Sequence, residues 1–219
     1  VLAVGTWSQP VTLQCPGSDA PHVYAEFHEP TAFFGQPVLV VGGGNSALGS
    51  ALSLAEAGAD VTLSMRRPPK DYRCGVRPYV RRNLGFAVDE GRIRLYADTV
   101  VREVAAESVL LQPVLYTGEE DLTEGTPEDY RESGPPFRVP ARFVFALLGH
   151  RPDIRTLRDT FGLALRGDGR PVCDKDTWET ERRGVFVAGS VADPSIDIVL
   201  KLREQARGVV QTIVARLNT

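Results

Sequence analysis

The chain has 219 residues, 42% of them hydrophobic and 24% charged, which is ordinary for a globular protein of one large domain or two small ones. Its formal net charge of −3 gives no basic surplus of the kind that indicates nucleic-acid binding. No apolar run approaches the roughly 20 residues that span a bilayer, and no signal peptide is recognisable, so we expect no membrane partner.

The three cysteines, Cys15, Cys74 and Cys173, form no C-x-x-C pair and have no metal-ligand spacing. An odd number of cysteines without a signal peptide fits a reducing compartment. We therefore expect a cytoplasmic protein, no metal site and structural rather than catalytic cysteines.

The first elements are a short strand and an irregular segment. Val1–Gly5 is an apolar run typical of a buried strand, and it stands at the first residue without a methionine, so we expect further sequence upstream. Residues 6–30 are rich in Pro, Gly and polar side chains, which predicts irregular structure.

A βαβ unit is predicted next. Val38–Val41 is a continuous β-branched and apolar run, typical of a parallel strand covered on both faces. A glycine turn follows at once, and then alanines and leucines recur at helical spacing until Gly58, a C-terminal cap. Val61–Met65 is the second strand.

The remaining elements are less regular. Residues 66–82 are strongly basic, and Ile93–Leu115 predicts an antiparallel meander of short strands. Residues 117–136 are acidic with few apolar side chains, which predicts a solvated hairpin loop. Two further buried strands are expected at Phe143–Leu148 and Val185–Gly189, and Ser195–Leu217 has helical periodicity.

The turn Gly42-Gly43-Gly44-Asn45-Ser46-Ala47 carries a dinucleotide-binding fingerprint, because it follows a strand and opens a helix. Gly42 permits the tight turn, Gly44 allows close approach of a pyrophosphate, and Ala47 allows helix and strand to pack closely. The helix N-terminus offers N–H groups and partial positive charge to the phosphates. The alternative interpretation is a glycine turn in an unrelated α/β protein.

The end of the second strand predicts which nucleotide is bound. An NAD site usually has Asp or Glu there, whereas this chain has Arg66 and Arg67, whose guanidiniums suit the 2′-phosphate of NADPH. The nearest acid, Asp60, precedes the strand. The alternative is a solvated basic turn with no ligand.

These motifs resemble the thioredoxin-reductase-like flavoproteins over nearly the whole chain. The glycine turn and the two arginines resemble their NADPH domain, and three other segments resemble parts of their FAD domain: residues 2–6, residues 148–153 beginning Leu148-Gly149, and residues 184–190 ending Gly189-Ser190. The resemblance implies NADPH and FAD as cofactors and assigns Gly149, Gly189 and Ser190 to the flavin side.

Two departures from that family narrow the expectation. Residues 21–30 lack the C-x-x-C of true thioredoxin reductases, and the late FAD motif ends in Ser190 where Asp is usual. The sequence is most similar to the bacillithiol-disulfide reductase branch. A thioredoxin-reductase-like ferredoxin or flavodoxin NADP reductase remains an alternative, as does a non-catalytic NADP(H)-sensing domain.

We therefore predict an α/β, two-dinucleotide-binding-domain (Rossmann-like) flavoprotein fold with a complete NADPH domain and a truncated FAD domain. Residues 34–147 form the former, and residues 1–33 and 148–219 the latter. Hydride would pass from NADPH through FAD to a disulfide, that of a low-molecular-weight thiol such as bacillithiol disulfide, or to a small-protein redox acceptor. The truncated chain would be inactive alone and would self-associate as a homo-oligomer, and no catalytic residue is assigned.

Overall fold

The computed structural model describes residues 1–5, 7–66, 76–116, 130–153, 155–167, 169–193 and 199–218. The chain divides into two compact units. One unit combines Val1–Gln9 with His150–Thr219, and the other is continuous over Pro10–Gly149. Two short strands, β1 (Gln9–Pro10) and β11 (His150–Arg151), pair with each other where the chain passes between the units.

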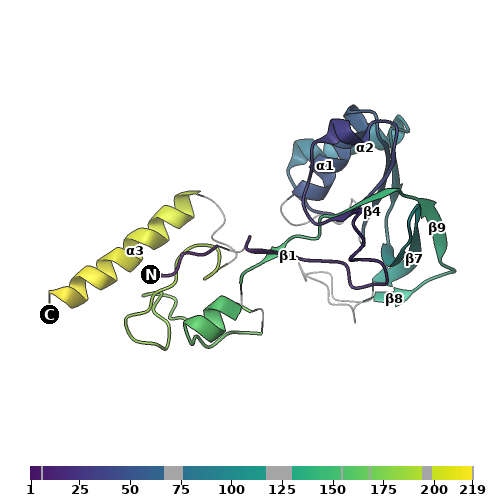
Figure 1. Ribbon diagram of the computed structural model, residues 1–219. Coiled ribbons are helices and arrows are strands. Elements are labelled where there is room, and N and C mark those ends of the chain that lie inside the picture. The colour runs from purple at the N-terminus through teal and green to yellow at the C-terminus, as the bar shows by residue number, and fades with distance from the viewer. Residues whose placement is uncertain are drawn as a thin grey trace. The chain divides into compact units, whose positions relative to one another are not determined.

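The unit Pro10–Gly149 is built around a five-stranded parallel sheet in the order β2-β10-β3-β4-β5. Its strands are β2 (Val23–Tyr24), β3 (Pro37–Val41), β4 (Asp60–Ser64), β5 (Ile93–Tyr96) and β10 (Phe143–Ala146). Two helices, α1 (Asn45–Glu56) and α2 (Pro78–Asp89), lie on one face of the sheet, as Figure 1 shows, and the 3-10 helix Pro30–Phe33 precedes β3.

An antiparallel layer covers the other face of this sheet (Figure 1). It contains β6 (Thr99–Val104), β7 (Ser108–Tyr116), β8 (Tyr130–Glu132) and β9 (Phe137–Pro140), with β7 paired to the other three. The predicted meander is therefore wrong in one respect, because Ile93–Tyr96 joins the parallel sheet as β5. The loop predicted for residues 117–136 ends earlier than expected, because Tyr130–Glu132 pairs with β7; residues 117–129 lie outside the described residues.

Strand β3 contributes to two hydrophobic cores because its residues alternate between the faces of the sheet. Val38 and Val40 pack with the helices, and Leu39 and Val41 pack with the antiparallel layer. The continuous apolar run is thus explained as a strand buried on both sides, as predicted.

Helix α1 ends as its sequence predicts. Gly58 has a φ of +87°, its amide donates to the carbonyl of Ala55, and the amide of Ala59 donates to the carbonyl of Leu54. This pair of bonds is the Schellman arrangement, which requires a left-handed residue and so favours glycine. The chain can then reverse directly into β4.

The unit of Val1–Gln9 and His150–Thr219 has less regular structure. It contains a short π-helix, Thr156–Thr160, and the long helix α3, Val199–Leu217; the first residues of the predicted helix, 195–198, lie outside the described residues. The strand predicted at Val185–Gly189 is wrong as an extended element, since its residues form only isolated bridges, Leu2 with Val187 and Glu179 with Phe186. Among the described residues, the segments beside Val185–Gly189 each pair with it through a single residue, and one pair of residues does not make a β-ladder.

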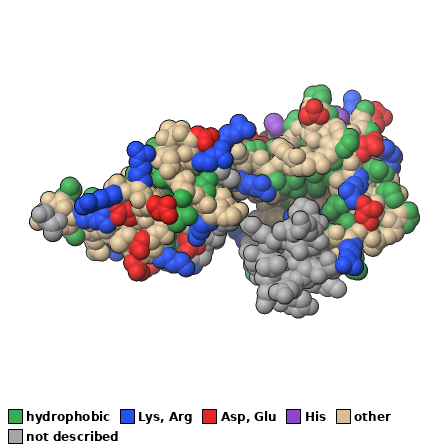
Figure 2. Space-filling view, turned by 90° about the horizontal axis from the view of Figure 1, so that it is seen from below, with side chains coloured by type: hydrophobic (Ala, Val, Ile, Leu, Met, Phe, Trp, Pro, Cys, Tyr) green, Lys and Arg blue, Asp and Glu red, His purple; other side chains and the backbone are tan. Residues whose placement is uncertain are grey.

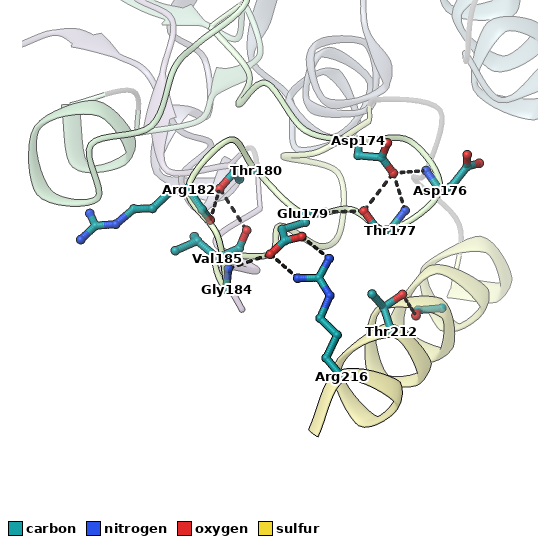
Figure 3. A network of polar contacts seen from close by, with 11 residues as sticks. Asp174, Asp176, Thr177, Glu179, Thr180, Arg182, Gly184, Val185, Thr212 and Arg216 are labelled. Carbon is teal, nitrogen blue, oxygen red and sulfur yellow. Dashed lines mark hydrogen bonds and ion pairs between the residues drawn. The ribbon is translucent and has the colours of Figure 1, made fainter. Parts of the chain in front are cut away.

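A polar network joins α3 to the turn that precedes these bridges (Figure 3). The Arg216 guanidinium forms an ion pair with the Glu179 carboxylate and lies 5.6 Å from the centroid of the Phe186 ring. The amide of Gly184 also donates to Glu179, at 2.7 Å. The last turn of α3 is therefore fixed to the same segment that holds Val187 in the core.

The buried strand predicted at Val1–Gly5 is wrong, because only Leu2 forms a bridge, with Val187, within the described part of the chain, and Val1 and Val4 are exposed. Val187, on the other side of that bridge, is fully buried. Basic and acidic side chains lie interspersed over each unit on the face shown in Figure 2. No helix among the described residues is long and apolar enough to cross a membrane.

The sequence placed the domain boundaries near residues 33 and 147, whereas the compact units divide after Gln9 and Gly149. Residues 10–33 belong to the continuous unit because β2 pairs with β10. Which cofactor each unit binds stays a prediction.

Candidate functional site

Gly42 stands where no other residue fits. Its φ is +138°, and a Cβ built on it would lie 2.4 Å from the carbonyl oxygen of Leu147, at the end of β10. Its amide donates to the carbonyl of Ser64 at 3.0 Å. The first glycine of the fingerprint therefore lets the turn pass between the ends of two neighbouring strands.

Helix α1 begins immediately after this turn with an open N-terminus. Gly44 is the N-cap residue in extended conformation, no side chain caps the helix, and no acid lies in its first turn. Gly44, Asn45 and Ser46 are exposed, Gly43 is half-buried and Ala47 is fully buried. A Cβ on Gly44 would meet no atom of the described residues within 4 Å, so none of these residues fills the space before the helix.

These features fit a pyrophosphate. The first amides of a helix have no intrahelical acceptor, and the helix dipole adds partial positive charge there. A backbone without side chains at Gly43 and Gly44 lets phosphate oxygens approach those amides. Ala47 packs against the sheet instead, which is the close helix–strand contact expected from the sequence.

The side chain of Asn45 has a role within the protein that the sequence did not predict. Its Oδ1 accepts a hydrogen bond of 2.9 Å from the backbone amide of Arg77, the N-cap residue of α2. The start of α2 is thereby held beside the start of α1. A surface hollow of about 540 Å³ lies along the first turns of α2, lined by Pro78, Tyr79, Arg81 and Arg82.

The end of β4 presents an arginine to solvent. The hydroxyls of Ser64 and Thr99 form a buried hydrogen bond of 2.9 Å, and Met65 is 2% exposed, so neither Ser64 nor Met65 faces solvent. Arg66 is the first exposed residue after the strand, and Arg67 lies outside the described residues. Asp60, predicted to precede the strand, is the first residue of β4 and so lies at the end of the strand opposite Arg66; its carboxylate pairs with Arg94 at 2.8 Å.

The topology brings the glycine turn to the place where α/β sheets bind ligands. The chain moves from β3 to β4 in one direction and returns on the other side as β10, so the strand order reverses at β3. Ligands bind outside the carboxyl ends of the strands at such a switch point. Gly42 follows β3 and Leu147 follows β10, so both lie at this edge.

Gly149 has a φ of +93°, and its carbonyl accepts a hydrogen bond of 2.9 Å from the amide of Val11. It closes the continuous unit, where a residue of positive φ is needed for the turn. Its assignment to the flavin side stays a prediction.

The segment Gly189-Ser190 lies in the discontinuous unit. Gly189 has a φ of +87°, and its amide donates at 2.6 Å to the Oε1 of Gln205 on α3. Gln205 is 6% exposed, and its Nε2 has no hydrogen-bond partner among the described residues. A buried amide without an acceptor is costly, so this donor fits a polar ligand group beside the turn.

The described thiols have no feature of a redox centre. Burial raises the pKa of the Cys15 thiol, and the charge of Glu103 raises it further. Burial is also the main cause that raises the pKa of Cys173. Both thiols therefore stay protonated near neutral pH, and Cys74 lies outside the described residues.

No group of three His, Cys, Asp or Glu side chains among the described residues is placed to hold a metal ion.

Three contacts of the site were not predicted from the sequence: those of Leu147, Arg77 and Gln205. Each joins residues far apart in the chain, so no local pattern carries it. Only Leu147 had a sequence signal, since it ends a predicted strand.

Comparison with known proteins gives the family of the chain. Residues 1–189 match the pyridine nucleotide-disulphide oxidoreductase family. The bacilliredoxin reductase Bdr of Bacillus subtilis is 30% identical over 193 residues, which cover 88% of this chain and 53% of that protein. A ferredoxin–NADP reductase of Ignicoccus hospitalis is 28% identical over 191 residues, which cover 87% of this chain and 55% of that protein.

Solved structures agree in fold. The bacillithiol disulfide reductase Bdr of Staphylococcus aureus superposes with a TM-score of 0.82 at 26% identity, covering 98% of this chain and 61% of that one. The thioredoxin reductase of T. acidophilum, at 18% identity and a TM-score of 0.69, shows the same fold. The chain spans about half the length of the curated relatives it matches. The predicted thioredoxin-reductase-like fold is thus confirmed, and the chain belongs to the pyridine nucleotide-disulphide oxidoreductase family.

Proposed function

We propose that the unit Pro10–Gly149 binds NADPH and supplies the hydride donor of a flavin-dependent disulfide reductase. The observation that carries this proposal is the joint placement of Gly42, the open N-terminus of α1 and Arg66. The glycine turn would hold the pyrophosphate. Arg66, with Arg67, would hold the 2′-phosphate through charge-assisted hydrogen bonds.

The discontinuous unit would contribute to an FAD site. Gly189 and Ser190 would contact the flavin, and Gln205 both fixes that turn and offers its buried Nε2 to a polar group of the cofactor. FAD, when bound, would supply the two-electron relay between the nicotinamide and the final acceptor. The family and the relatives support this assignment.

For the acceptor we propose a low-molecular-weight disulfide. The segment 21–30, where thioredoxin reductases carry their exposed dithiol, has no cysteine in this chain. Similarity to Bdr proteins of Bacillus subtilis and Staphylococcus aureus supports a bacillithiol-type disulfide. Similarity to the ferredoxin–NADP reductase of Ignicoccus hospitalis supports ferredoxin as the second candidate.

Calorimetric titration of the chain with NADPH and with NADH tests the first proposal. Each charge-assisted contact with the phosphate contributes about 1.5–3 kcal/mol, so we expect at least about a tenfold preference for NADPH. Arg66→Ala should reduce that preference. The matched control is Arg142→Ala, which removes an exposed arginine just before β10. Equal dissociation constants for the two cofactors in the unchanged protein would contradict the proposal.

The acceptor is tested with the natural full-length protein, supplied with FAD and NADPH. Bacillithiol disulfide, ferredoxin and thioredoxin are compared as acceptors by the rate of NADPH oxidation. Turnover of thioredoxin alone would refute the proposal. A full-length protein that binds NADPH but has no visible flavin absorbance would support the remaining alternative, a non-catalytic sensor.

A further inference from the structure

Arg66 and Tyr130 are in contact although they come from different layers of the molecule. The guanidinium carbon of Arg66, just after β4, lies 5.4 Å from the centroid of the Tyr130 ring, at the start of β8. A cation over an aromatic ring at this distance is attracted by the negative charge of the ring face.

Backbone hydrogen bonds fix the end of β4 against the β5–β6 turn. The amide of Met65 donates to the carbonyl of Tyr96 at 3.0 Å, and the amide of Thr99 donates to the carbonyl of Met65 at 3.1 Å. Both the amide and the carbonyl of Met65, the residue before Arg66, are therefore hydrogen-bonded to this turn. Because Met65 is also buried, the backbone from which Arg66 projects has little freedom.

Further backbone hydrogen bonds connect the β5–β6 turn to β7, and β7 to β8. The amide of Val114, on β7, donates to the carbonyl of Asp98 in the β5–β6 turn at 2.8 Å. Two residues further along β7, Tyr116 pairs with Tyr130 in the antiparallel register. A continuous set of backbone bonds thus connects the end of β4 to the strand position from which the Tyr130 side chain projects.

An arginine that binds a phosphate must give up side-chain rotamers when the ligand arrives. A ring packed against the guanidinium removes part of that freedom before binding, and the contact uses the charge of the group rather than its N–H donors. The aromatic partner therefore favours binding of a dianion without competing with it for hydrogen bonds. A cofactor with only a hydroxyl at this position gains nothing from this preorganisation.

We propose that Tyr130 is a positioning residue that determines cofactor specificity: its ring holds Arg66 in place for the 2′-phosphate of NADPH. This inference rests on the proposed function, in which Arg66 binds that phosphate. It assigns part of the nucleotide site to the antiparallel layer, in a segment whose sequence indicated a solvated loop.

The test compares two substitutions at Tyr130 with a control on the same strand. Tyr130→Leu removes the ring, Tyr130→Phe keeps it, and Glu132→Gln breaks only the ion pair of Glu132 with Arg102. Calorimetry with NADPH should show about a fivefold weaker affinity for Tyr130→Leu, and affinities near that of the unchanged protein for the other two. Affinity for NADH should be the same in all four proteins.

A double-mutant cycle separates positioning from a general structural effect. In a chain carrying Arg66→Ala, Tyr130→Leu should cause no further loss of NADPH affinity, because there is no guanidinium to position. Circular dichroism and the midpoint of thermal unfolding check the fold. If Tyr130→Leu does not fold, Tyr130→Thr makes the same test with a residue suited to a strand.

The outcomes distinguish this inference from the function on which it rests. If the unchanged protein binds NADPH and NADH equally, the proposed function fails. If it prefers NADPH but Tyr130→Leu weakens both cofactors equally or neither, the proposed function stands and the role of Tyr130 is overturned.

Discussion

The amide nitrogen of Gly42 lies 3.0 Å from the carbonyl oxygen of Ser64, so the turn after β3 is bonded to the last residue of β4. The pyrophosphate side and the ribose side of the candidate site are therefore joined by one direct hydrogen bond. The position of the glycine turn therefore depends on the backbone of β4.

Gly42→Ala should destabilise the protein, whereas Gly44→Ala should mainly weaken nucleotide binding. An alanine at 42 combines an unfavourable φ of +138° with a contact of 2.4 Å to the Leu147 carbonyl, and should lower the free energy of unfolding by about 2 kcal/mol or more. An alanine at 44 meets no atom in the described part of the chain and costs at most about 1 kcal/mol as a poorer N-cap. Urea unfolding and calorimetry measure the two effects, and equal stabilities would contradict this assignment.

Ser64→Ala should reduce stability without changing cofactor preference. It removes the buried hydrogen bond to Thr99, whose hydroxyl keeps its other bond to the Tyr96 carbonyl, so the expected loss is about 1 kcal/mol. The ratio of NADPH to NADH affinities should stay constant because Ser64 does not face solvent. A changed ratio would show that this hydroxyl contacts the ribose.

Gln205→Leu should release the turn that carries Ser190. It leaves the Gly189 amide without its acceptor, which costs about 1–3 kcal/mol for a buried donor. Hydrogen exchange of the Gly189 amide should become faster in Gln205→Leu and stay slow in Gln205→Glu, which keeps an acceptor. Unchanged exchange in Gln205→Leu would mean that another group holds the turn.

The ion pair of Glu179 and Arg216 predicts a loss of stability in acid. The hydrogen bond from Arg216 and then that from the Gly184 amide lower the pKa of Glu179 below its ordinary value. A group whose pKa is lower in the folded state stabilises the protein above its unfolded pKa, about 4.3, and this stabilisation is lost as pH falls through the folded pKa. Stability should therefore decline below about pH 4.3.

Arg216→Met should make that decline shallower, and Arg207→Met, at an exposed position of the same helix, should leave it unchanged. Urea unfolding between neutral and acidic pH measures both variants. Equal pH profiles for Arg216→Met and the unchanged protein would show that the ion pair does not form in solution.

The 219-residue chain should bind NADP(H) and purify without flavin. Its 219 residues contain one strand–glycine turn–helix fingerprint, the one at Gly42, and an FAD pyrophosphate needs another helix N-terminus. The dipole of an exposed helix terminus contributes only about 0.3–1 kcal/mol, which cannot offset the several kcal/mol of association entropy. Stoichiometric flavin absorbance in the purified chain would show that this division of the cofactor sites is wrong.

The sequence predicted the elements whose pattern is local. Val38–Val41, the glycine turn and the helix closed by Gly58 each carry their own periodicity or capping signal, and the structure has them nearly where expected. Strand β5 was assigned to the wrong sheet because its sequence shows that it is a strand but not which strand it pairs with.

The contacts of the candidate site were less predictable, for a physical reason. The carbonyl that excludes a side chain at Gly42 is that of Leu147, just after β10, and the ring beside Arg66 is that of Tyr130, which lies beyond an acidic stretch. Such neighbours are decided by the order of strands in the sheets. The prediction of a strand around Val187 was wrong for a similar reason. A buried apolar segment forms a β-ladder only where a neighbouring extended segment pairs with it over several residues.

The central position of β3 also has a consequence for how the protein is made. Its pairing with β10, in which Val40 lies opposite Phe145, joins residues roughly 100 positions apart, and such closures slow folding. During synthesis β3, α1 and β4 leave the ribosome long before β10 does, so one edge of β3 has no partner in the nascent chain. An uncovered apolar edge invites pairing with other chains, so we expect the yield of native protein to depend on how fast translation delivers β10.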